Sequence, residues 1–306
     1  MRIVAYLGVK DEVELIERTI EHLRAIGVDL IIAVDSRSTD GTAEILKSYE
    51  SKDNFWLFQM DDLRRDDTEQ TWLRRNMEII QRAEADWVIL LDADEYWLPL
   101  SGSLKDCADL CSSDVLSVDR FNVPLQPSGA MVPDQLIRNR YSEIFLFVEP
   151  IPNFQSQLHE NPRTAWIQGV PVPKVTARVK HIAGWTVGMH DAIAADGTEP
   201  VRSKPSDLII AHLPFTTFSR FARKVENIRG VFARFDAYFP GEMGWHWRRW
   251  VRLADEGRLR EEFEKQVCGE DAIADFRRRR IVRSAAELLE DRMRERHVSA
   301  VPSLHP

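Results

Sequence analysis

The chain has 306 residues, 44% of them hydrophobic and 29% charged, so it can bury a large core, and its net charge of −8 argues against general nucleic-acid binding. Its three cysteines match no zinc-binding spacing and indicate free thiols in a reducing compartment. The sequence shows no signal-peptide pattern and no apolar run of about 20 residues, so we expect a cytoplasmic protein without a transmembrane segment.

The first 97 residues alternate short apolar runs with amphipathic segments. The apolar runs predict buried strands at residues 2–9, 30–34, 55–60 and 87–91. Helices are predicted between them, the first capped by Asp11 and ended by Gly27, and the last at residues 68–83. This order predicts an α/β fold with a Rossmann-like, mostly parallel central sheet and helices on both faces. Ligands of such sheets bind at the carboxyl ends of the strands, where Asp35 and Asp92 fall.

The rest of the chain is less regular. We expect short strands at residues 115–118, 143–148 and 175–179, an exposed loop at 194–205, and helices from about 215 to 297 with a break near Pro240.

Three acids, Asp92, Asp94 and Glu95, directly follow the predicted strand at 87–91. Such carboxylates repel one another unless a positive group lies between them. Hard oxygen ligands suit Mg²⁺ or Mn²⁺, so we expect a divalent cation shared with a phosphorylated ligand. The alternative is a solvated acidic turn.

Four segments carry motifs in a fixed order. They are Lys10-Asp11-Glu12, Asp35-Ser-Arg-Ser-Thr-Asp-Gly-Thr42, Leu91-Asp-Ala-Asp-Glu-Tyr96 and His212-Leu-Pro-Phe-Thr-Thr-Phe-Ser-Arg-Phe-Ala-Arg-Lys224. Together they resemble the motifs of family 2 glycosyltransferases, which have the GT-A fold. The resemblance implies an enzyme that moves a sugar from a nucleoside-diphosphate sugar to an acceptor hydroxyl with inversion, using Mn²⁺ or Mg²⁺.

On this resemblance we expect a GT-A domain at residues 1–215 and a helical C-terminal region at 216–306. The domain would have a nucleotide-sugar-binding half at 1–97 and an acceptor-side half at 98–215. A UDP-sugar is favoured, but Ser36 stands where many relatives carry a second acid, which leaves guanosine and thymidine open. The acceptor is equally open: a glycan, a lipid-linked sugar, a protein or a small molecule.

The resemblance also implies site residues. Asp94 would bind the metal directly, Asp92 would contact ribose or metal-bound water, and His212 or His190 would complete the metal shell. Either histidine could instead be buried with hydrogen-bond partners.

The remaining binding and catalytic assignments each have an alternative. Asp35 and Glu12 would contact the nucleoside, or else cap a helix and complement a helix dipole. Arg75, in preference to Arg74, would approach the diphosphate, as would Lys174 and Lys224 if they are not surface lysines. Asp191 is the predicted catalytic base, with Glu160 and Glu149 as rivals, and Glu95 would orient the acids or face the acceptor.

The C-terminal helices leave three readings open. The segment Gly244-Trp-His-Trp-Arg-Arg-Trp250 could stack on an acceptor sugar, make peripheral membrane contact, or pack as a helix. The basic run at 277–280 is read as a solvated helix, and either helix could pair subunits into a homodimer.

Two other functions compete with the transferase. A non-catalytic carbohydrate-binding protein could keep the same fold. A phosphohydrolase of the haloacid dehalogenase type also places D-x-D after a strand, but usually after the first strand and followed by small residues, whereas here the fourth strand is followed by Glu-Tyr-Trp. A methyltransferase or dehydrogenase would need a glycine-rich loop that this sequence lacks.

Overall fold

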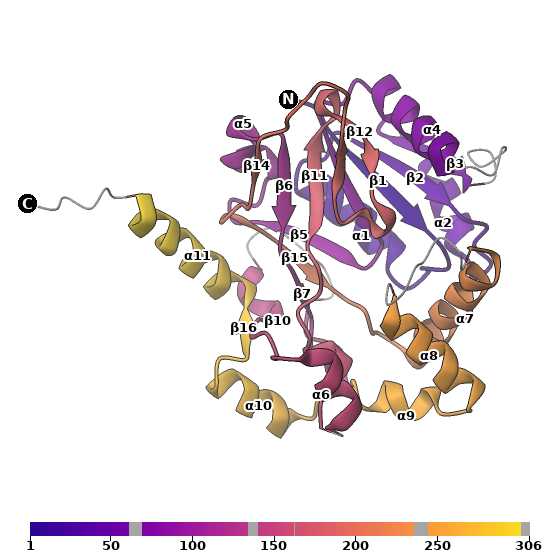
Figure 1. The fold of residues 1–306 in the computed structure, drawn as a ribbon, viewed down its shortest axis with the longest axis vertical. Coiled ribbons are helices and arrows are strands. Elements are labelled where there is room, and N and C mark those ends of the chain that lie inside the picture. Colours follow the sequence, from indigo (N-terminus) through magenta and orange to yellow (C-terminus); the bar gives the residue numbers. More distant parts are fainter. Residues whose placement is uncertain (61–68, 134–139, 162, 236–243, 301–306) are drawn as a thin grey trace, which may run out of the picture.

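A computed structural model describes residues 1–60, 69–133, 140–161, 163–235 and 244–300 (Figure 1). Its largest element is a seven-stranded sheet in the order β14-β6-β11-β4-β1-β2-β3. The strands are β1 (Ile3–Val9), β2 (Leu30–Asp35), β3 (Phe55–Gln59), β4 (Trp87–Asp92), β6 (Val115–Val118), β11 (Lys174–Arg178) and β14 (Arg202–Ser203). Strand β11 runs antiparallel to β4 and β6, and the other neighbouring pairs are parallel.

Each face of this sheet carries its own apolar core, because successive residues of a strand point to opposite faces. On one face Ile3, Ala5 and Leu7 pack with α1 (Ile16–Ala25) and α2 (Thr42–Tyr49). On the other face Val4 and Tyr6 pack with α4 (Glu69–Arg82). The predicted fold class, a mostly parallel sheet covered by helices on both faces and followed by C-terminal helices, is confirmed.

A second sheet of three strands follows the order β5-β15-β7. Its strands are β5 (Glu95–Pro99), β7 (Arg120–Asn122) and β15 (Leu208–His212). At one end of β15, His212 lies opposite Glu95 and Asn122, and at its other end Leu208 lies opposite Pro99. Because β5 begins just after β4 ends, the first of these ends adjoins the carboxyl edge of the large sheet.

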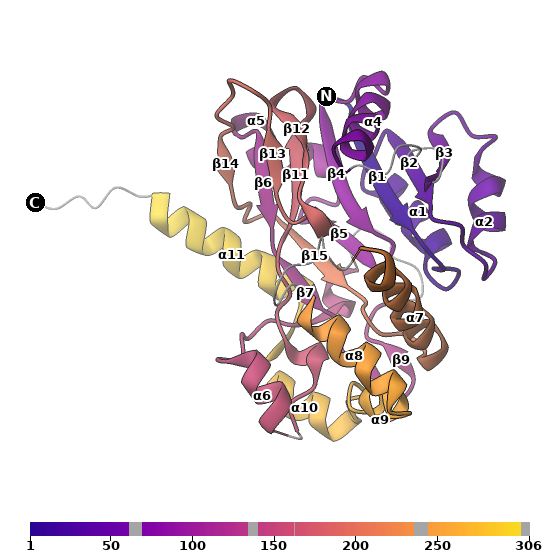
Figure 2. The ribbon, with the colours of Figure 1, turned by 45° about the vertical axis from the view of Figure 1, so that its right-hand side comes forward.

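Shorter strands and the remaining helices complete the chain. The strand pairs are β8 (Leu125–Gln126) with β9 (Gly129–Ala130), β10 (Phe145–Phe147) with β16 (Val282–Ser284), and β12 (Ile182–Trp185) with β13 (Ala192–Ala194). The other α-helices are α5 (Asp109–Ser112), α6 (Phe154–Glu160), α7 (Phe218–Phe235), α8 (Trp245–Asp255), α9 (Leu259–Glu264), α10 (Glu270–Arg278) and α11 (Ala285–Ala300). Figure 2 shows α7, α8 and α9 grouped together, with α7 beside the tip of β15.

Three expectations need correction. Asp11 does not cap α1, whose N-cap is Leu15, and its carboxylate instead accepts hydrogen bonds from Thr39 N (2.7 Å) and Asn227 Nδ2 (2.9 Å). The C-terminal helices are interrupted by β16, which pairs with β10. The loop expected at 194–205 contains β14, an edge strand of the large sheet. The break predicted near Pro240 lies outside the described residues.

None of the described helices combines the length and the apolar character that crossing a membrane requires.

Candidate active site

The carboxyl ends of three strands bring the predicted site residues to one edge of the large sheet. Val9, at the end of β1, lies opposite Asp35 on β2, and its neighbour Gly8 lies opposite Asp92 on β4. The turn after Asp92 places Asp94 and then Glu95, the first residue of β5. The acids therefore gather where the topology of a parallel sheet predicts a ligand.

Asp94 is the most enclosed of these acids, with a side chain that is 1% exposed. Its Oδ2 accepts hydrogen bonds from Lys224 Nζ and from Arg220 Nη2 (3.0 Å), and His212 Nε2 lies 3.7 Å away. Burial alone would raise the pKa of Asp94, but the charges of Lys224 and Arg220 hold that pKa well below its usual range. Asp94 is therefore an ionised carboxylate inside the protein, not the solvated acidic turn that was the alternative.

Arg220 on α7 connects the loop after β1 to Asp94. Its Nε and Nη2 donate to Glu12 Oε2 (2.6 Å) and Oε1 (3.1 Å), and its Nη1 donates to the carbonyl oxygens of Leu213 and Pro214 (3.2 and 3.3 Å). Burial opposes its charge, but Glu12 and Asp94 raise the pKa of Arg220 above its ordinary value. The sequence analysis missed this residue, although its position four residues before Lys224 places both side chains on one face of α7.

Lys174 and Arg120 neutralise the other two acids of the triplet. Lys174 Nζ lies 2.7 Å from Asp92 Oδ2 and 3.4 Å from Glu95 Oε1, and Arg120 Nη1 donates to the same Glu95 oxygen at 2.5 Å. Glu95 Oε2 accepts from the backbone N of Asp92 at 3.0 Å. Glu95 is 0% exposed, so this geometry favours its expected role in orienting Asp92 over the role of facing an acceptor.

The chain itself therefore supplies the charge compensation that the sequence analysis assigned to a metal ion. Four acids, Glu12, Asp92, Asp94 and Glu95, face four cations, Arg120, Lys174, Arg220 and Lys224. Buried arginine and lysine side chains therefore make the acid triplet tolerable in this structure, and the case for a bound cation does not rest on charge compensation alone. Lys174 is 1% exposed, which also excludes the surface-lysine alternative for this residue.

His212 has the protonation state of a metal ligand. Its Nδ1 lies 2.7 Å from Asn122 Oδ1, which accepts only, so Nδ1 carries the proton and donates. Burial, and next the charge of Arg120, hold the pKa of His212 well below its ordinary value, so the ring is neutral. The unprotonated Nε2 then faces Asp94 Oδ2, and two carboxylates with a neutral imidazole are a donor set that fits Mn²⁺ better than Mg²⁺.

His190 and Asp191 lie in the segment between β12 and β13. The Nδ1 atom of His190 is 2.9 Å from the carbonyl oxygen of Pro173, and burial, followed by the charges of Lys174 and Arg120, lowers its pKa. Asp191 is 54% exposed and pairs with Arg202 at 2.5 Å. Its rivals as catalytic base, Glu149 and Glu160, are both exposed.

The alternative roles suggested for Asp35 and Glu12 were to cap a helix and to complement a helix dipole, and the contacts of both side chains lie elsewhere. The carboxylate of Asp35 accepts from Ser38 N at 3.1 Å, and α2 has Gly41 as its N-cap with a φ of 103°, so Asp35 does not cap that helix. Glu12 pairs with Arg220 and lies 3.3 Å from Lys224 Nζ. Both acids are buried at the carboxyl edge of the sheet.

The two arginines on α4 differ in exposure. Arg74 is 70% exposed and lies 3.7 Å from Glu78, one helical turn away. Arg75 is half-buried on the same helix. This difference agrees with the preference for Arg75 as the arginine that faces the site.

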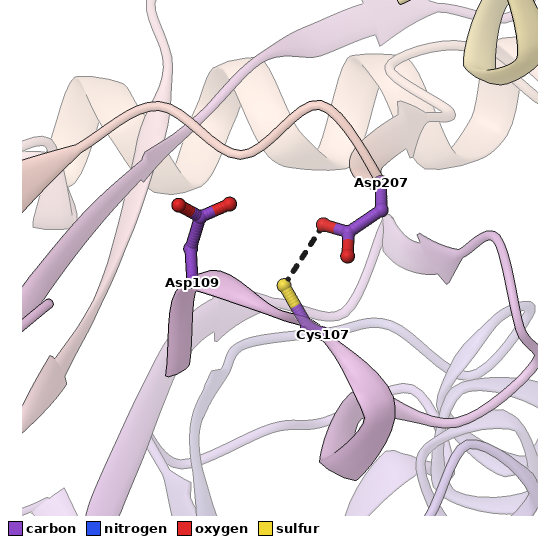
Figure 3. Close-up of side chains that lie close together, drawn as sticks. All are labelled: Cys107, Asp109 and Asp207. Atoms are coloured by element: carbon purple, nitrogen blue, oxygen red, sulfur yellow. Dashed lines mark hydrogen bonds between the residues drawn. The ribbon is translucent and has the colours of Figure 1, made fainter. Parts of the chain in front are cut away.

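A second group of side chains with metal-binding chemistry lies at the far end of the small sheet (Figure 3). Cys107 donates through Sγ to Asp207 Oδ1 (3.0 Å), and the other oxygen of Asp207 accepts from Ala108 N (3.0 Å). Asp109 pairs with Arg296 on α11 at 2.6 Å. Burial, together with Asp207, raises the pKa of the Cys107 thiol above its ordinary value, and the Asp109–Arg296 pair links this group to α11.

The family model described as Glycosyl transferase family 2 matches residues 7–114. No curated protein matches the chain. Among solved structures, Staphylococcus aureus TarS 1–349 in complex with UDP is 15% identical with a TM-score of 0.35, over 67% of this chain and 60% of that chain. Glucosyl-3-phosphoglycerate synthase from Mycobacterium tuberculosis, in complex with Mn²⁺, UDP and glucosyl-3-phosphoglycerate, is 15% identical with a TM-score of 0.33, over 59% and 58% of the two chains. The chain thus spans about three fifths of the length of these solved chains.

The polar residues of this α/β domain gather at the carboxyl ends of parallel strands, the edge at which ligands of such sheets bind. The match of residues 7–114 to the family 2 glycosyltransferase model agrees with the resemblance that the motifs predicted. This region contains Asp35 and the acid triplet, whereas Arg120, Lys174, His212 and Arg220 come from beyond it.

Proposed function

We propose that the chain is a metal-dependent, inverting glycosyltransferase that takes its sugar from a nucleoside-diphosphate sugar, with a UDP-sugar as the first donor to test. One observation carries the proposal. In a chain with a family 2 region, the neutral Nε2 of His212 faces the ionised carboxylate of Asp94 at 3.7 Å, next to Asp92. The haloacid dehalogenase alternative is not supported, because in such an enzyme the D-x-D acids would follow the first strand, whereas here they follow β4.

The donor would lie across the carboxyl edge of the large sheet. Asp35 and Glu12 would accept hydrogen bonds from the nucleoside, and Asp92 would bind ribose or a metal-bound water. Lys174, Lys224 and Arg75 would contact the diphosphate from different elements, since lysine and arginine donate well to phosphate oxygens. These roles are supported by burial and charge at the edge of the sheet.

Asp94 and His212 would hold the metal, with His190 as the alternative imidazole. When bound, Mn²⁺ or Mg²⁺ would stabilise the negative charge that develops on the departing diphosphate. Asn122 keeps His212 in the ligating tautomer, and Arg220 fixes the direction of Asp94. The chain therefore orders the ligands before the ion arrives.

Asp191 would take the proton of the acceptor hydroxyl. Its exposed carboxylate is held by Arg202 and by the backbone N of Ala192 (2.7 Å), so it must leave this ion pair to reach an acceptor. Replacing Asp191 by Asn should abolish transfer to the acceptor and leave donor binding unchanged. Normal transfer by this variant would move the assignment to Glu160 or Glu149.

The test of the proposed function is a thermal-shift panel of UDP, GDP and dTDP, each with Mn²⁺, with Mg²⁺ and with a chelator. We expect one nucleotide to raise the melting temperature in the presence of metal, because a ligand that binds the folded state stabilises it. The matching nucleotide sugar should then be turned over. A panel without any shift would contradict donor binding, and a shift without turnover would favour a non-catalytic carbohydrate-binding protein.

Cytoplasmic location, the domain boundary at residue 215 and a homodimer remain predictions.

A further inference from the structure

The tryptophan-rich start of α8 is divided between the core and the surface. Trp250 is 2% exposed and packs with Phe215 and Phe221 in the core of the helical region. Trp247 lies against Trp250 with ring centroids 4.9 Å apart. In the first turn of the helix, Trp245 and His246 are half-exposed. Trp250 therefore packs in the core, as the packed-helix alternative predicted. That alternative does not explain why Trp245 and His246 are partly exposed.

Trp166 joins this first turn to the candidate active site. It begins the short 3-10 helix Trp166–Gln168 and is half-exposed. Its ring centroid is 5.3 Å from that of His246 and 6.4 Å from that of His212. The Nε2 atom of His212 in turn lies 3.7 Å from Asp94 Oδ2. The aromatic surface therefore begins directly beside a proposed metal ligand.

Asn122 fixes this surface relative to the metal ligand. Its Oδ1 accepts from His212, and its Nδ2 donates to the carbonyl oxygen of Gly169 at 2.9 Å, just after the 3-10 helix. The backbone N of Ile167 donates to Gln266 Oε1 at 2.9 Å. Trp166 is therefore held in place by side chains from two other parts of the chain, which is the preorganisation that a binding surface needs.

A polar side chain, His246, lies next to the aromatic rings. Burial, and then the charge of Arg120, lower the pKa of His246 to about 4, so its ring is neutral. The ring of His246 lies against Trp166 and Trp245, with centroids 5.3 and 5.6 Å apart. A neutral imidazole can both donate to and accept from the hydroxyl groups of a ligand.

We propose that Trp166, Trp245 and His246 form the acceptor subsite and that the acceptor is a sugar residue. The apolar face of a pyranose ring would stack on Trp166, while its hydroxyl groups would bond to His246. Aromatic walls with a few placed polar groups are typical of small-molecule sites. This inference rests on the proposed function, because it assigns the acceptor of the same reaction.

A membrane surface is a less suitable binding partner for this segment than a sugar. Two of the arginines that follow on α8 are paired within the chain: Arg249 Nη2 donates to the buried Glu262 Oε2 at 2.7 Å, and the exposed Arg252 lies 3.9 Å from Glu256. Phosphate headgroups would have to break these ion pairs. Sugar binding needs no such change.

The test uses saturation-transfer-difference NMR on the full chain without any donor. The probes are the methyl glycosides of glucose, galactose, mannose, rhamnose and N-acetylglucosamine. We expect saturation of the ring protons of at least one glycoside, an affinity about tenfold lower in Trp166→Ala and His246→Ala, and recovery of most of the affinity in Trp166→Phe. The matched control is Trp56→Ala on β3, a half-exposed tryptophan outside this surface, which should bind as the wild type does.

Absence of binding by every glycoside, or equal binding by the wild type and Trp166→Ala, would overturn the proposal. Binding instead to vesicles of phosphatidylglycerol that is lost in Trp245→Ala would replace the sugar by a membrane. If Trp166→Ala fails to fold, His246→Ala and Trp245→Ala decide the matter, since both side chains are half-exposed. Failure of the proposed function looks different: glycoside binding would persist while no nucleotide shifted the melting temperature.

Discussion

The two ends of the three-stranded sheet carry acid clusters that look alike in composition and differ in chemistry. At one end, Asp94 and Glu95 are buried among four cationic side chains and lie next to a neutral histidine. At the other end, Asp109 and Asp207 are satisfied by Arg296, by a backbone N–H and by the thiol of Cys107. The two ends of β15, Leu208 and His212, are four residues apart in sequence, which corresponds to about 13 Å along the strand.

This comparison shows that a group of acids does not by itself define a metal site. The clusters differ in the donor set and in the topology around it. His212 offers an unprotonated nitrogen to the first cluster, whereas the protonated thiol of Cys107 already donates its proton to Asp207. The first cluster also lies where parallel strands end, which is the ligand edge of this fold.

Replacing the acid at each end should give the largest contrast. Asp94→Asn should lower transfer by about 10³-fold, because it removes charge at the point where the leaving group is stabilised. Asp207→Asn should leave transfer nearly unchanged. Steady-state turnover of the donor found in the nucleotide panel measures both. Comparable losses in the two variants would mean that the ends are not functionally distinct.

The same Asp94 variant should also lose stability. Asp94 is 1% exposed and pairs with Arg220 and Lys224, so its neutralisation leaves buried cations in excess.

Replacing the arginine at each end should show that the buried ion pairs contribute more to stability than the exposed one. Arg220→Met leaves Lys224 as the remaining cation beside Glu12 and Asp94 and should cost about 3–5 kcal/mol of unfolding free energy. Arg296→Met breaks a pair whose arginine is 42% exposed and should cost about 1 kcal/mol or less. Urea unfolding of both variants gives the comparison. Arg220→Lys keeps the charge without the bidentate contact, so an apparent Mn²⁺ affinity weaker than wild type in that variant would identify Arg220 as a positioning residue.

The contribution of the metal to nucleotide binding should be lost when a residue at the first end of the sheet is replaced, and kept when a residue at the second end is replaced. With nucleotide and Mn²⁺ at a hundred times the dissociation constant, we expect about 2.7 kcal/mol of stabilisation in the wild type. His212→Ala should lose the part of this stabilisation that Mn²⁺ adds, whereas Asp109→Asn should keep it. Differential scanning fluorimetry with and without chelator makes the measurement. An unchanged metal effect in His212→Ala would transfer the ligand role to His190.

The smallest expected effect is a dependence of stability on pH that comes from a neutral histidine beneath the site. His22 on α1 is buried with Nε2 at 2.8 Å from the carbonyl oxygen of Trp97, and burial lowers its pKa to about 4. The unfolded chain binds this proton near pH 6.5, so the contribution is complete above that pH and falls as the pH drops towards 4. Between pH 7 and pH 5 the loss should be about 2 kcal/mol. Urea unfolding at both pH values should show it, and His22→Gln should reduce the slope.

Much of the fold and the position of the acids could be predicted from local sequence. Buried parallel strands are short apolar runs, and amphipathic helices repeat their apolar residues every three or four positions, so the strands at Ile3–Val9 and Trp87–Asp92 were both expected. Asp35 and Asp92 follow such strands directly, so their meeting follows from a parallel topology alone. The strand Val282–Ser284 was missed because three residues carry no periodicity and its pairing with β10 is made across more than 130 positions.

The sequence by itself determined the α/β architecture, the resemblance of residues 7–114 to a glycosyltransferase family and the acids at the end of β4, because each depends on residues that are neighbours along the chain. Only the tertiary structure decided what neutralises those acids. Arg120, Lys174 and Arg220 come from β7, β11 and α7, and a lone cation in a sequence gives no sign of the carboxylate that it will meet. Burial and Coulomb attraction act through space, so the protonation state of His212 and the pairing of Asp94 emerge only when distant segments pack together.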